Sequence, residues 1–360
     1  MAKLLCLGKK NKLVSLFCSR LFVTLCAKSC KVMDQRKLYY LLHSGKNSNL
    51  KYYLRSYLRE WTPSVFFQLQ LEHLLARIER REDKDYIYRR AAYYCKLEAD
   101  SPFDQSQWEK EAVMLKDQPM TGQSSYYHDA MEIARYFNSR KKWILVPGDT
   151  IHVPALPSIV KSRPLTENNT NNVVLKLDKN RHFLFVHDNK PWREKRDMAI
   201  FRGDLGYYKP NRDVFMNRWV GHPMIDAAST NRSDEHPEWQ GGKLTIGEHL
   251  DYKFIMSLEG NDVASNLKWV MSSNSIAVTP RLRRETWFME GTLKPNYHYI
   301  EVSDDFSDLE ERLTYYIEHP EEAEAIIQHA HDYVAQFQDK EREKLIALVV
   351  LKKYFDFTNQ

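Results

Sequence analysis

Apolar residues change their spacing partway along the chain, which divides it into two differently patterned halves. Over residues 34 to about 137, leucines and isoleucines recur near every 3.6 residues with charged residues between them, as in amphipathic helices. Short apolar runs that predict strands come later, at Trp143 to Val146, Val173 to Leu177, His182 to Val186 and Met198 to Phe201. The first half is therefore expected to be helix-rich and irregular.

The second half alternates between strand-like and helix-like segments. Its expected strands are Tyr252 to Leu258, Ser275 to Val278 and Tyr297 to Val302, and its expected helices are residues 263–273, 306–318 and 320–355. Pro320 suits the first turn of the last helix. Because parallel strands need a crossover, which is usually a helix, the pattern predicts a doubly wound parallel sheet over about residues 210–340.

Charge is distributed unevenly along the chain. Residues 1–100 contain 20 Lys or Arg and 9 Asp or Glu, whereas the remainder contains 33 and 39. The basic part indicates an anionic partner, either a membrane surface, a phosphorylated substrate or nucleic acid, although a solvated basic face is an equally good interpretation. The chain lacks the helix-turn-helix pattern and the Arg-rich strands with interleaved aromatic residues that would support nucleic-acid binding.

Residues 1–33 are basic and apolar. The run from Leu13 to Ala27 is interrupted by Arg20, and no segment approaches the length of a membrane span. We expect an amphipathic helix that packs or lies on a membrane surface, and the alternative is a dispensable leader with a start at Met33. Four of the five cysteines lie in the first thirty residues without metal-site spacing, which favours a reduced compartment.

A strand-turn-helix junction follows Tyr252. The strand is expected to end at Leu258, Gly260 to allow a tight turn, and a helix to begin near Asp262, so that free backbone N–H groups face the carboxyl edge of the sheet. That geometry binds phosphate. Further donors near the turn are Asn261, Ser265, Asn266 and Lys268. The alternative is an ordinary junction in which Asp262 is only a helix cap.

Two arginines follow the strand at residues 198–201. Arg202 lies at the expected strand end, and Arg212 opens an expected helix. Either guanidinium could clamp a diphosphate with paired N–H donors. The alternative for each is a surface ion pair.

Asp149 follows the strand at residues 143–146 in a loop fixed by prolines. A carboxylate there could take a proton from an attacking hydroxyl, although Asp in Gly-Asp-Thr is also an ordinary turn residue. His152, Arg181 and His182 are similarly ambiguous. The sequence has no HExxH, GxSxG or P-loop motif, and no DxD carboxylate pair at a suitable strand end.

Taken in order, these clusters resemble glycosyltransferase family 90, and within it the bacterial lipopolysaccharide branch. The resemblance covers residues 143–337. Its motifs are Gly148-Asp-Thr-Ile-His-Val-Pro-Ala-Leu-Pro with Lys161-Ser-Arg, Ile200-Phe-Arg-Gly with Arg212-Asp, Glu259-Gly-Asn-Asp with Ser272-Ser-Asn-Ser, and Leu293-Lys-Pro with Tyr297-His-Tyr-Ile. Four ordered matches at compatible spacing are far more specific than one.

The resemblance implies an α/β protein of the GT-B type, with two Rossmann-like domains facing a cleft and a helical N-terminal extension. The expected parts are a basic amphipathic leader at 1–33, a helix-rich, acceptor-side Rossmann-like domain at 34–205, a donor-binding Rossmann-like domain at 206–340 and a C-terminal helix at 341–360. A UDP-sugar would bind in the cleft as a substrate, with no cofactor and no metal, and transfer would invert the anomeric carbon.

The resemblance also assigns roles to individual residues. Asp149 matches the catalytic base, Arg212 the arginine on the donor diphosphate, and Asp204 a small polar donor-site residue. The phosphate-binding turn is matched by Gly260, Asn261, Asp262, Val263, Ala264, Ser265 and Asn266. Eukaryotic members have an arginine where this chain has Asn266, and Lys268, Arg202 or Arg181 is expected to compensate.

The resemblance implies transfer of a hexose, glucose or galactose, from the UDP-sugar to a lipid-linked saccharide acceptor, the lipopolysaccharide inner core. The expected location is cytoplasmic, peripheral on the inner face of a bacterial inner membrane, where the basic N-terminal part meets an anionic membrane surface. No nucleic-acid partner is expected. The alternatives are a nucleic-acid-binding protein and a catalytically silent, sugar-binding transferase homologue.

Overall fold

The computed structural model describes residues 35–205, 209–231 and 235–359, so the expected leader lies outside the described residues. The described residues fall into two units, one that ends at Gly45 and one that begins at Lys46. The first contains helix α2 (Gln35–His43), and all other described elements belong to the second. Within these ranges, no helix combines the length and the apolar character needed to cross a bilayer.

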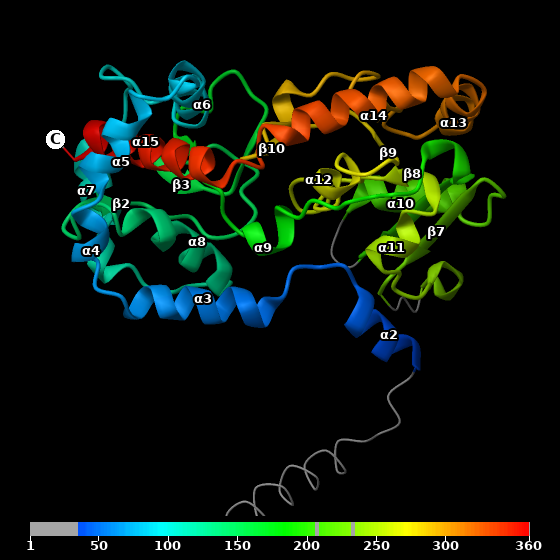
Figure 1. The fold of residues 1–360 in the computed structure, drawn as a ribbon, viewed down its shortest axis with the longest axis horizontal. Helices are drawn as coiled ribbons and strands as arrows, with labels where there is room; N and C mark the ends of the chain where they lie inside the picture. The colour runs from blue at the N-terminus through cyan, green and yellow to red at the C-terminus, as the bar shows by residue number, and fades with distance from the viewer. Residues whose placement is uncertain (1–34, 206–208, 232–234, 360) are drawn as a thin grey trace, which may run out of the picture. The chain divides into compact units, whose positions relative to one another are not determined.

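A five-stranded parallel sheet organises the second half of the chain (Figure 1). Its strands are β6 (Arg196–Gly203), β7 (Ile225–Ser229), β8 (Tyr252–Met256), β9 (Ile276–Thr279) and β11 (Ile300–Glu301), in the spatial order β11-β9-β8-β6-β7. The chain runs from β6 to β7 at one edge and then returns to β8 on the other side of β6. The carboxyl ends of β6 and β8 therefore flank a topological switch point, where open α/β sheets bind ligands.

Helices connect and cover these strands. They are α10 (Pro210–Trp219), α11 (Ile246–His249), α12 (Leu267–Val270), α13 (Leu309–Glu318) and α14 (Pro320–Ala335). The apolar sides of α10, α13 and α14 pack with the strands in one buried core. The predicted parallel sheet is thereby confirmed. Its boundary needs correction, because β6, which the sequence assigned to the preceding domain, pairs with both β7 and β8.

Helices dominate the part before the sheet, as expected. They are α3 (Asn49–Trp61), α4 (Val65–Gln68), α5 (Leu71–Ile78), α6 (Lys84–Tyr94), α7 (Gln105–Glu111), α8 (Ser124–Ala134) and α9 (Lys179–His182). The short strands form pairs: β1 (Val113–Met114) with β2 (Lys142–Trp143), β3 (Ser158–Val160) with β5 (Asn172–Val174), and β4 (Ser162–Pro164) with β10 (Arg284–Thr286). Because the described sheets here have two strands each, the two-domain GT-B arrangement stays a prediction.

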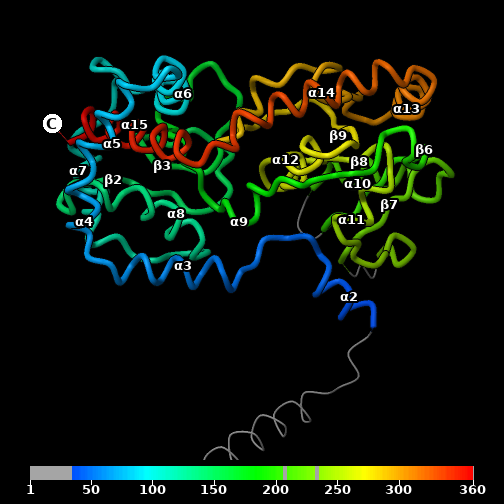
Figure 2. The backbone as a smooth tube through the Cα atoms, viewed as in Figure 1, coloured from blue at the N-terminus to red at the C-terminus, as the bar shows by residue number. Residues whose placement is uncertain are grey.

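The C-terminal helix α15 (Lys340–Thr358) returns to the N-terminal helices and contacts α5, α6 and α8, as the red end of the tube in Figure 2 shows. The apolar spacing predicted one helix over 320–355, but the structure has two, and the second lies close to the C-terminal helix that the expected domain division placed at 341–360. Asp339 begins the second, because its side chain accepts hydrogen bonds from the backbone N–H groups of Glu341 and Arg342. The long C-terminal periodicity thus covers two helices with different partners.

The strand expected over residues 182–186 is absent from the structure. His182 ends α9, and the backbone N–H of Val186 donates to Ser272 Oγ at 2.9 Å. The backbone N–H of Val186 is thus satisfied by a side-chain hydroxyl and not by the carbonyl of a neighbouring strand. Alternating apolar residues show that one side of a segment is buried. An irregular segment that packs on a hydrophobic core has the same pattern as a strand, so the pattern alone does not distinguish them.

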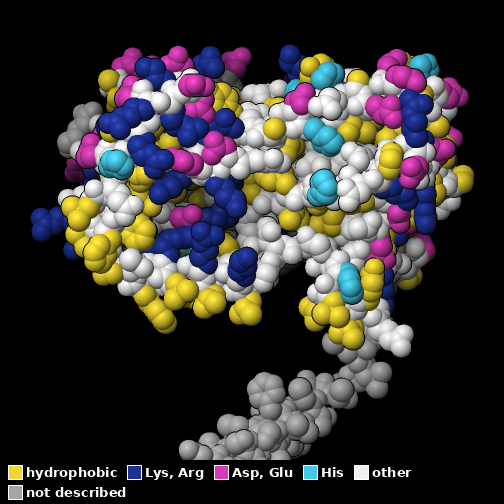
Figure 3. Space-filling view, viewed as in Figure 1, with side chains coloured by type: hydrophobic (Ala, Val, Ile, Leu, Met, Phe, Trp, Pro, Cys, Tyr) yellow, Lys and Arg dark blue, Asp and Glu magenta, His cyan; other side chains and the backbone are white. Residues whose placement is uncertain are grey.

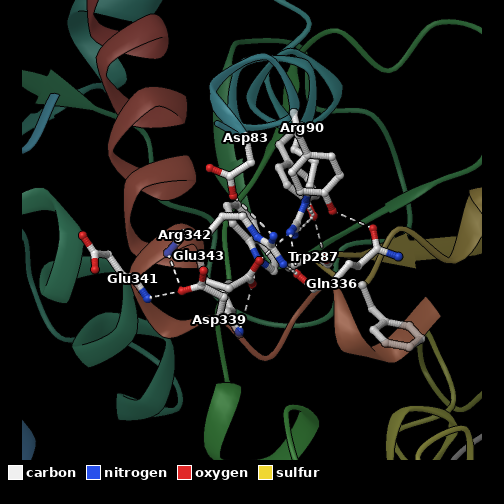
Figure 4. A network of polar contacts seen from close by, with 12 residues as sticks. Asp83, Arg90, Trp287, Gln336, Asp339, Glu341, Arg342 and Glu343 are labelled. Atoms are coloured by element: carbon white, nitrogen blue, oxygen red, sulfur yellow. Dashed lines mark hydrogen bonds and ion pairs between the residues drawn. The ribbon is translucent and has the colours of Figure 1, made fainter. Parts of the chain in front are cut away.

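A buried ionic network ties α15 to the N-terminal helices (Figure 4). Glu343 accepts hydrogen bonds from Arg90 Nη1 at 2.5 Å, Trp287 Nε1 at 2.6 Å and Lys176 Nζ at 3.0 Å. Arg90 and Glu343 are both buried. One carboxylate thus accepts hydrogen bonds from three separate segments, and its loss would leave the buried Arg90 without its carboxylate partner.

Glu343→Gln is expected to lower the free energy of unfolding by about 1.5–3 kcal/mol, the usual contribution of hydrogen bonds to charged groups. Urea titration followed by circular dichroism measures the change. Glu341→Gln is the matched control, since Glu341 lies on the same helix and forms an exposed ion pair with Arg77. An exposed pair contributes about 0–1 kcal/mol. Equal destabilisation by both substitutions would contradict the role given to Glu343.

Candidate active site

Asp149 lies in the loop after β2, held by contacts between two sequence motifs. Gly148 has φ of +105°, in the left-handed region that glycine adopts readily, and turns the chain just before Asp149. The backbone N–H of Thr150 donates to Ser162 Oγ at 3.1 Å, and that hydroxyl donates back to the Thr150 carbonyl at 3.0 Å. The Gly-Asp-Thr and Lys-Ser-Arg motifs are thereby fixed against each other.

The two carboxylate oxygens of Asp149 have different surroundings. Oδ1 accepts hydrogen bonds from Lys161 Nζ at 2.5 Å and from the Tyr126 hydroxyl at 3.0 Å. Among the described residues, Oδ2 has one long contact, 3.3 Å to Asn261 Nδ2. Asp149 and Asn261 both line a pocket of about 400 Å³, together with Gly122, Gln123, Tyr126, Pro147 and Gly148. Oδ2 is therefore the oxygen better placed to take a proton from a molecule in this pocket.

Lys161 connects two carboxylates in the interior. Its Nζ lies 2.5 Å from Asp149 Oδ1 and 2.6 Å from Asp262 Oδ2, and its side chain is 1% exposed. Burial alone would raise the pKa of Asp149, but the charge and hydrogen bond of Lys161, with help from Arg181, lower it below the ordinary value. Asp149 is therefore ionised at neutral pH, which is the form that a general base requires.

This pairing predicts a specific pH dependence. A base with a lowered pKa stays deprotonated as the pH falls from 7 to 5. We therefore expect protonation of Asp149 to reduce turnover only below about pH 3.9, the ordinary aspartate pKa. Lys161→Met removes the main cause of the lowering and leaves the burial. The pKa of Asp149 then rises, and turnover falls earlier on acidification, about tenfold for each unit by which that pKa exceeds the assay pH.

Turnover against pH for wild type, Lys161→Met and the charge-conserving Lys161→Arg measures this dependence. Thermal unfolding at each pH separates it from loss of folded protein. Only the Met variant should show the shift. Superimposable profiles for Lys161→Met and wild type would exclude control of Asp149 by Lys161.

The turn after β8 differs from the expected phosphate site. The sequence placed the helix start near Asp262, but α12 begins at Leu267. Asp262 is buried and paired with Lys161, and Asn266 Nδ2 donates to the Met256 carbonyl at 3.0 Å. These tertiary contacts hold the segment as an irregular turn, because they engage the polar side chains that would otherwise cap a helix. An anion site built on a helix N-terminus at Asp262 is therefore not formed.

The remaining residues of the expected turn are divided between core and surface. Val263 and Ala264 are buried, and Ala264 packs in the larger hydrophobic core. Ser265 is exposed. Only Asn261 of this segment has a side-chain contact with Asp149.

Arg212 lies at the switch point of the sheet. Its guanidinium donates to the carbonyls of Asp204 at 2.7 Å, Leu258 at 2.9 Å and Glu259 at 3.2 Å, and so joins the segments that follow β6 and β8. A Cβ at Gly260 would lie 3.2 Å from Arg212 Nη2, so glycine gives the guanidinium its room. Burial lowers the pKa of Arg212. A half-buried cation that donates hydrogen bonds to neutral carbonyls favours an added anion.

Asp204 lies beside Arg212. Its carbonyl accepts from Arg212, its carboxylate accepts from Asn231, and Lys209 Nζ lies 3.5 Å from Oδ2. Its side chain is about half exposed. The structure therefore places Asp204, Arg212 and Gly260 together at the carboxyl end of the sheet, with Asn261 linking this group to Asp149.

Two of the cations expected to compensate for Asn266 are engaged elsewhere. Lys268 is completely buried and pairs with buried Glu290 at 2.7 Å. Arg202 pairs with Asp226 at 2.7 Å and also donates to the carbonyls of Phe201 and Asp226. Each of these cations therefore already has a carboxylate partner within the protein, and a contribution of either one to a diphosphate site stays a prediction.

Arg181 is the expected cation that lies near Asp149. Its side chain is about half exposed, pairs with Asp178 at 2.8 Å and approaches Asp149 Oδ1 to 3.7 Å. His152 is exposed, and its carbonyl accepts from Asn172 Nδ2 at 3.0 Å. His182 is buried against Lys161, and its burial and the nearby cations lower its pKa well below the ordinary value. His182 is therefore neutral, and it packs beside Lys161 as a structural residue.

Lys161 and Tyr126 contact Asp149 but were not singled out as site residues. Lys161 directly follows the apolar strand β3, and a lysine in a buried run signals a buried ionic partner. Tyr126 lies on α8 and carries no comparable signal in the sequence. Within the described ranges, no three His, Cys, Asp or Glu side chains cluster as a metal ion would need. The expectation that no metal takes part stays a prediction.

Comparison with known proteins identifies relatives of this chain. The model of Glycosyl transferase family 90 matches residues 172–357. The O-glucosyltransferase LpsA of Dichelobacter nodosus is 41% identical over 237 residues, which cover 66% of this chain and 74% of that protein. Protein O-glucosyltransferase 1 of Rattus norvegicus is 28% identical over 138 residues, 35% of this chain and 33% of that protein. The family match includes Arg212 and the turn after β8, whereas Asp149 precedes it.

Proposed function

The chain belongs to glycosyl transferase family 90 and is a glycosyltransferase, and we propose that it transfers a glucosyl group from a UDP-sugar to a saccharide acceptor with inversion. The proposal of glucose rests on the LpsA relative, whose name describes O-glucosyl transfer. The observation that carries the proposal is the placement of Asp149, Asn261 and Arg212 around one turn at the carboxyl end of the sheet.

The donor half of the proposal rests on Arg212. Its guanidinium is half-buried at the switch point and held by three carbonyls, so it is preorganised for an anion that arrives there. The diphosphate of the donor supplies two negative groups. Asn261 provides a further side-chain N–H donor near the same end of the sheet. No cofactor or metal is needed in this scheme, because the arginine itself stabilises the leaving diphosphate.

The acceptor half rests on Asp149 Oδ2. The acceptor hydroxyl gives its proton to Oδ2, and its oxygen forms a bond to the anomeric carbon from the face opposite the diphosphate. The bond between that carbon and the diphosphate oxygen breaks, and UDP leaves with the electron pair. One displacement of this kind inverts the anomeric configuration. Lys161 and Tyr126 hold the carboxylate through Oδ1 and leave Oδ2 directed at the pocket.

The acceptor and the location belong to the same proposal. We propose a lipid-linked saccharide, the lipopolysaccharide inner core, modified at the cytoplasmic face of a bacterial inner membrane. The basic N-terminal hundred residues support an anionic membrane surface as partner. That no nucleic acid takes part stays a prediction.

A donor screen tests the proposed function. Purified protein is incubated with UDP-glucose, UDP-galactose or UDP-xylose and with truncated lipopolysaccharide, and released UDP is measured. We expect acceptor-dependent UDP release to be greatest with UDP-glucose and to be reduced by about 10²–10⁴-fold in Asp149→Asn. Greater release with another donor would exclude the glucosyl assignment. UDP binding without release under any condition would favour the catalytically silent homologue.

A further inference from the structure

Helix α3 packs with its polar side and exposes its apolar side. Towards α8, Tyr52 donates a hydrogen bond to Asp129 at 2.8 Å, and Arg59 pairs with Glu132 at 2.5 Å. Glu60 Oε1 lies 2.6 Å from His128 Nδ1 in the same interface. A surface helix of a globular protein normally turns its apolar stripe to the core and its polar residues to water. The inverted arrangement leaves the apolar stripe of α3 facing outwards.

The exposed stripe continues onto the following turn and helix. We call it the α3–α4 ridge, and it comprises Leu50, Leu54, Leu58, Trp61, Phe66 and Leu69. Each of these residues is between 53% and 81% exposed. Figure 3 shows hydrophobic side chains gathered along the edge that α3 and α4 form, with Lys and Arg side chains next to them. A contiguous apolar surface of this kind marks an interaction site.

Basic side chains accompany the ridge. Residues 46–70 contain four Lys or Arg and one Glu, and Lys51 and Arg55 are exposed on α3 itself. Arg55 and Arg59 also line a small pocket of about 210 Å³ with Lys344 and Glu132. Trp61, 80% exposed, and Tyr57 are the residue types enriched at the boundary between lipid and water. The apolar ridge matches the acyl-chain layer of an anionic lipid surface, and the basic side chains beside it match the layer of headgroup phosphates.

We propose that the α3–α4 ridge docks the protein onto an anionic lipid bilayer. The 13 residues of α3 form a helix about 20 Å long, too short to cross the hydrocarbon layer, so the helix lies in the plane of the surface. The apolar residues enter the boundary between headgroups and acyl chains, and Lys51 and Arg55 meet the lipid phosphates. This deepens the proposed function by naming the surface that would bring the enzyme to a lipid-linked acceptor.

Vesicle sedimentation with the full chain tests this inference. The vesicles contain phosphatidylcholine alone or phosphatidylcholine with phosphatidylglycerol, and neither donor nor acceptor is added. Failure here therefore leaves the transferase activity to be judged separately. We expect binding to the anionic vesicles, weaker binding in high salt, and an affinity loss of about tenfold or more for Leu54→Gln with Leu58→Gln and Trp61→Ala. The matched control is Met120→Gln with Tyr315→Gln, which removes exposed apolar residues outside the ridge and should bind as wild type.

Two further measurements make the result decisive. Thermal unfolding should be unchanged in the ridge variant, since the replaced side chains are exposed. Lys51→Gln with Arg55→Gln should weaken binding to anionic vesicles and leave the weak binding to neutral ones unaltered. Equal vesicle binding by wild type and the ridge variant would overturn the proposal. So would a wild-type dimer that ignores vesicles and that the ridge substitutions convert to a monomer, because the ridge would then be a self-association surface.

Discussion

Asp149→Asn is expected to lower the turnover number for glycosyl transfer by about 10²–10⁴-fold, the range typical of a general base. An amide cannot accept the hydroxyl proton at Oδ2, although it keeps the shape of the side chain. UDP binding should change little, because the described contacts of Arg212 with Asp204, Leu258 and Glu259 do not involve Asp149. Steady-state kinetics and calorimetric UDP titration measure the two effects separately.

The matched control for this substitution is Asp251→Asn. Asp251 also pairs with a lysine, Lys190 at 2.8 Å, but its side chain is 44% exposed and remote from the pocket. Its turnover should equal that of wild type. If Asp149→Asn folds, binds UDP and retains near-normal turnover, Asp149 has no role as the base.

Arg212→Ala is expected to reduce kcat/KM by about 10³-fold, in the range found when a preorganised charge donor is removed from a leaving group. In contrast to the Asp149 variant, it should also weaken UDP binding, because the same guanidinium would contact the diphosphate before and during transfer. Arg212→Lys keeps the charge and loses the fixed fork of N–H donors, so its activity should lie between alanine and wild type. UDP affinity and kcat/KM are measured for both variants.

Arg218→Ala is the control on the same helix. Arg218 points outwards from α10, and its guanidinium lies 3.6 Å from exposed Asp305. We expect wild-type kinetics and UDP affinity from it. Thermal unfolding shows whether Arg212→Ala is folded. If it is not, the activity and UDP affinity of Arg212→Lys test the role of Arg212. Unchanged UDP affinity in folded Arg212 variants would remove this residue from the donor site.

The strands of the main sheet were largely predictable from local pattern. The apolar runs before Gly203 and Glu259 became β6 and β8, and the run at 275–278 became β9. These strands are buried on both faces, so their sequences read as continuous apolar segments. β7 escaped prediction, because Ile225–Ser229 is short and contains an aspartate. Its place beside β6 depends on backbone pairing rather than on side-chain hydrophobicity.

The candidate site was predictable in its chemistry and less so in its contacts. The sequence singled out Asp149, Arg212 and the turn around Gly260, and the structure brings them to one end of the sheet. It gave no indication that Asp262 would pair with Lys161 instead of capping a helix. Nor did it indicate that Lys268 would be buried against Glu290. The expected roles of Asp262 as a helix cap and of Lys268 as a diphosphate ligand both assumed that a polar residue near a turn faces solvent or ligand.

The sequence by itself determined the family, the alternation that builds the parallel sheet and the residue types available for catalysis. Only the tertiary structure decided which charges meet. Lys161 lies 12 residues from Asp149, and Asn261 lies 112 residues from it, yet both contact its carboxylate. Local spacing records which side of a segment is buried. The partner of a buried charge depends on how distant segments cross, and in the interior an unpaired charge is costly enough that this pairing fixes the side chain.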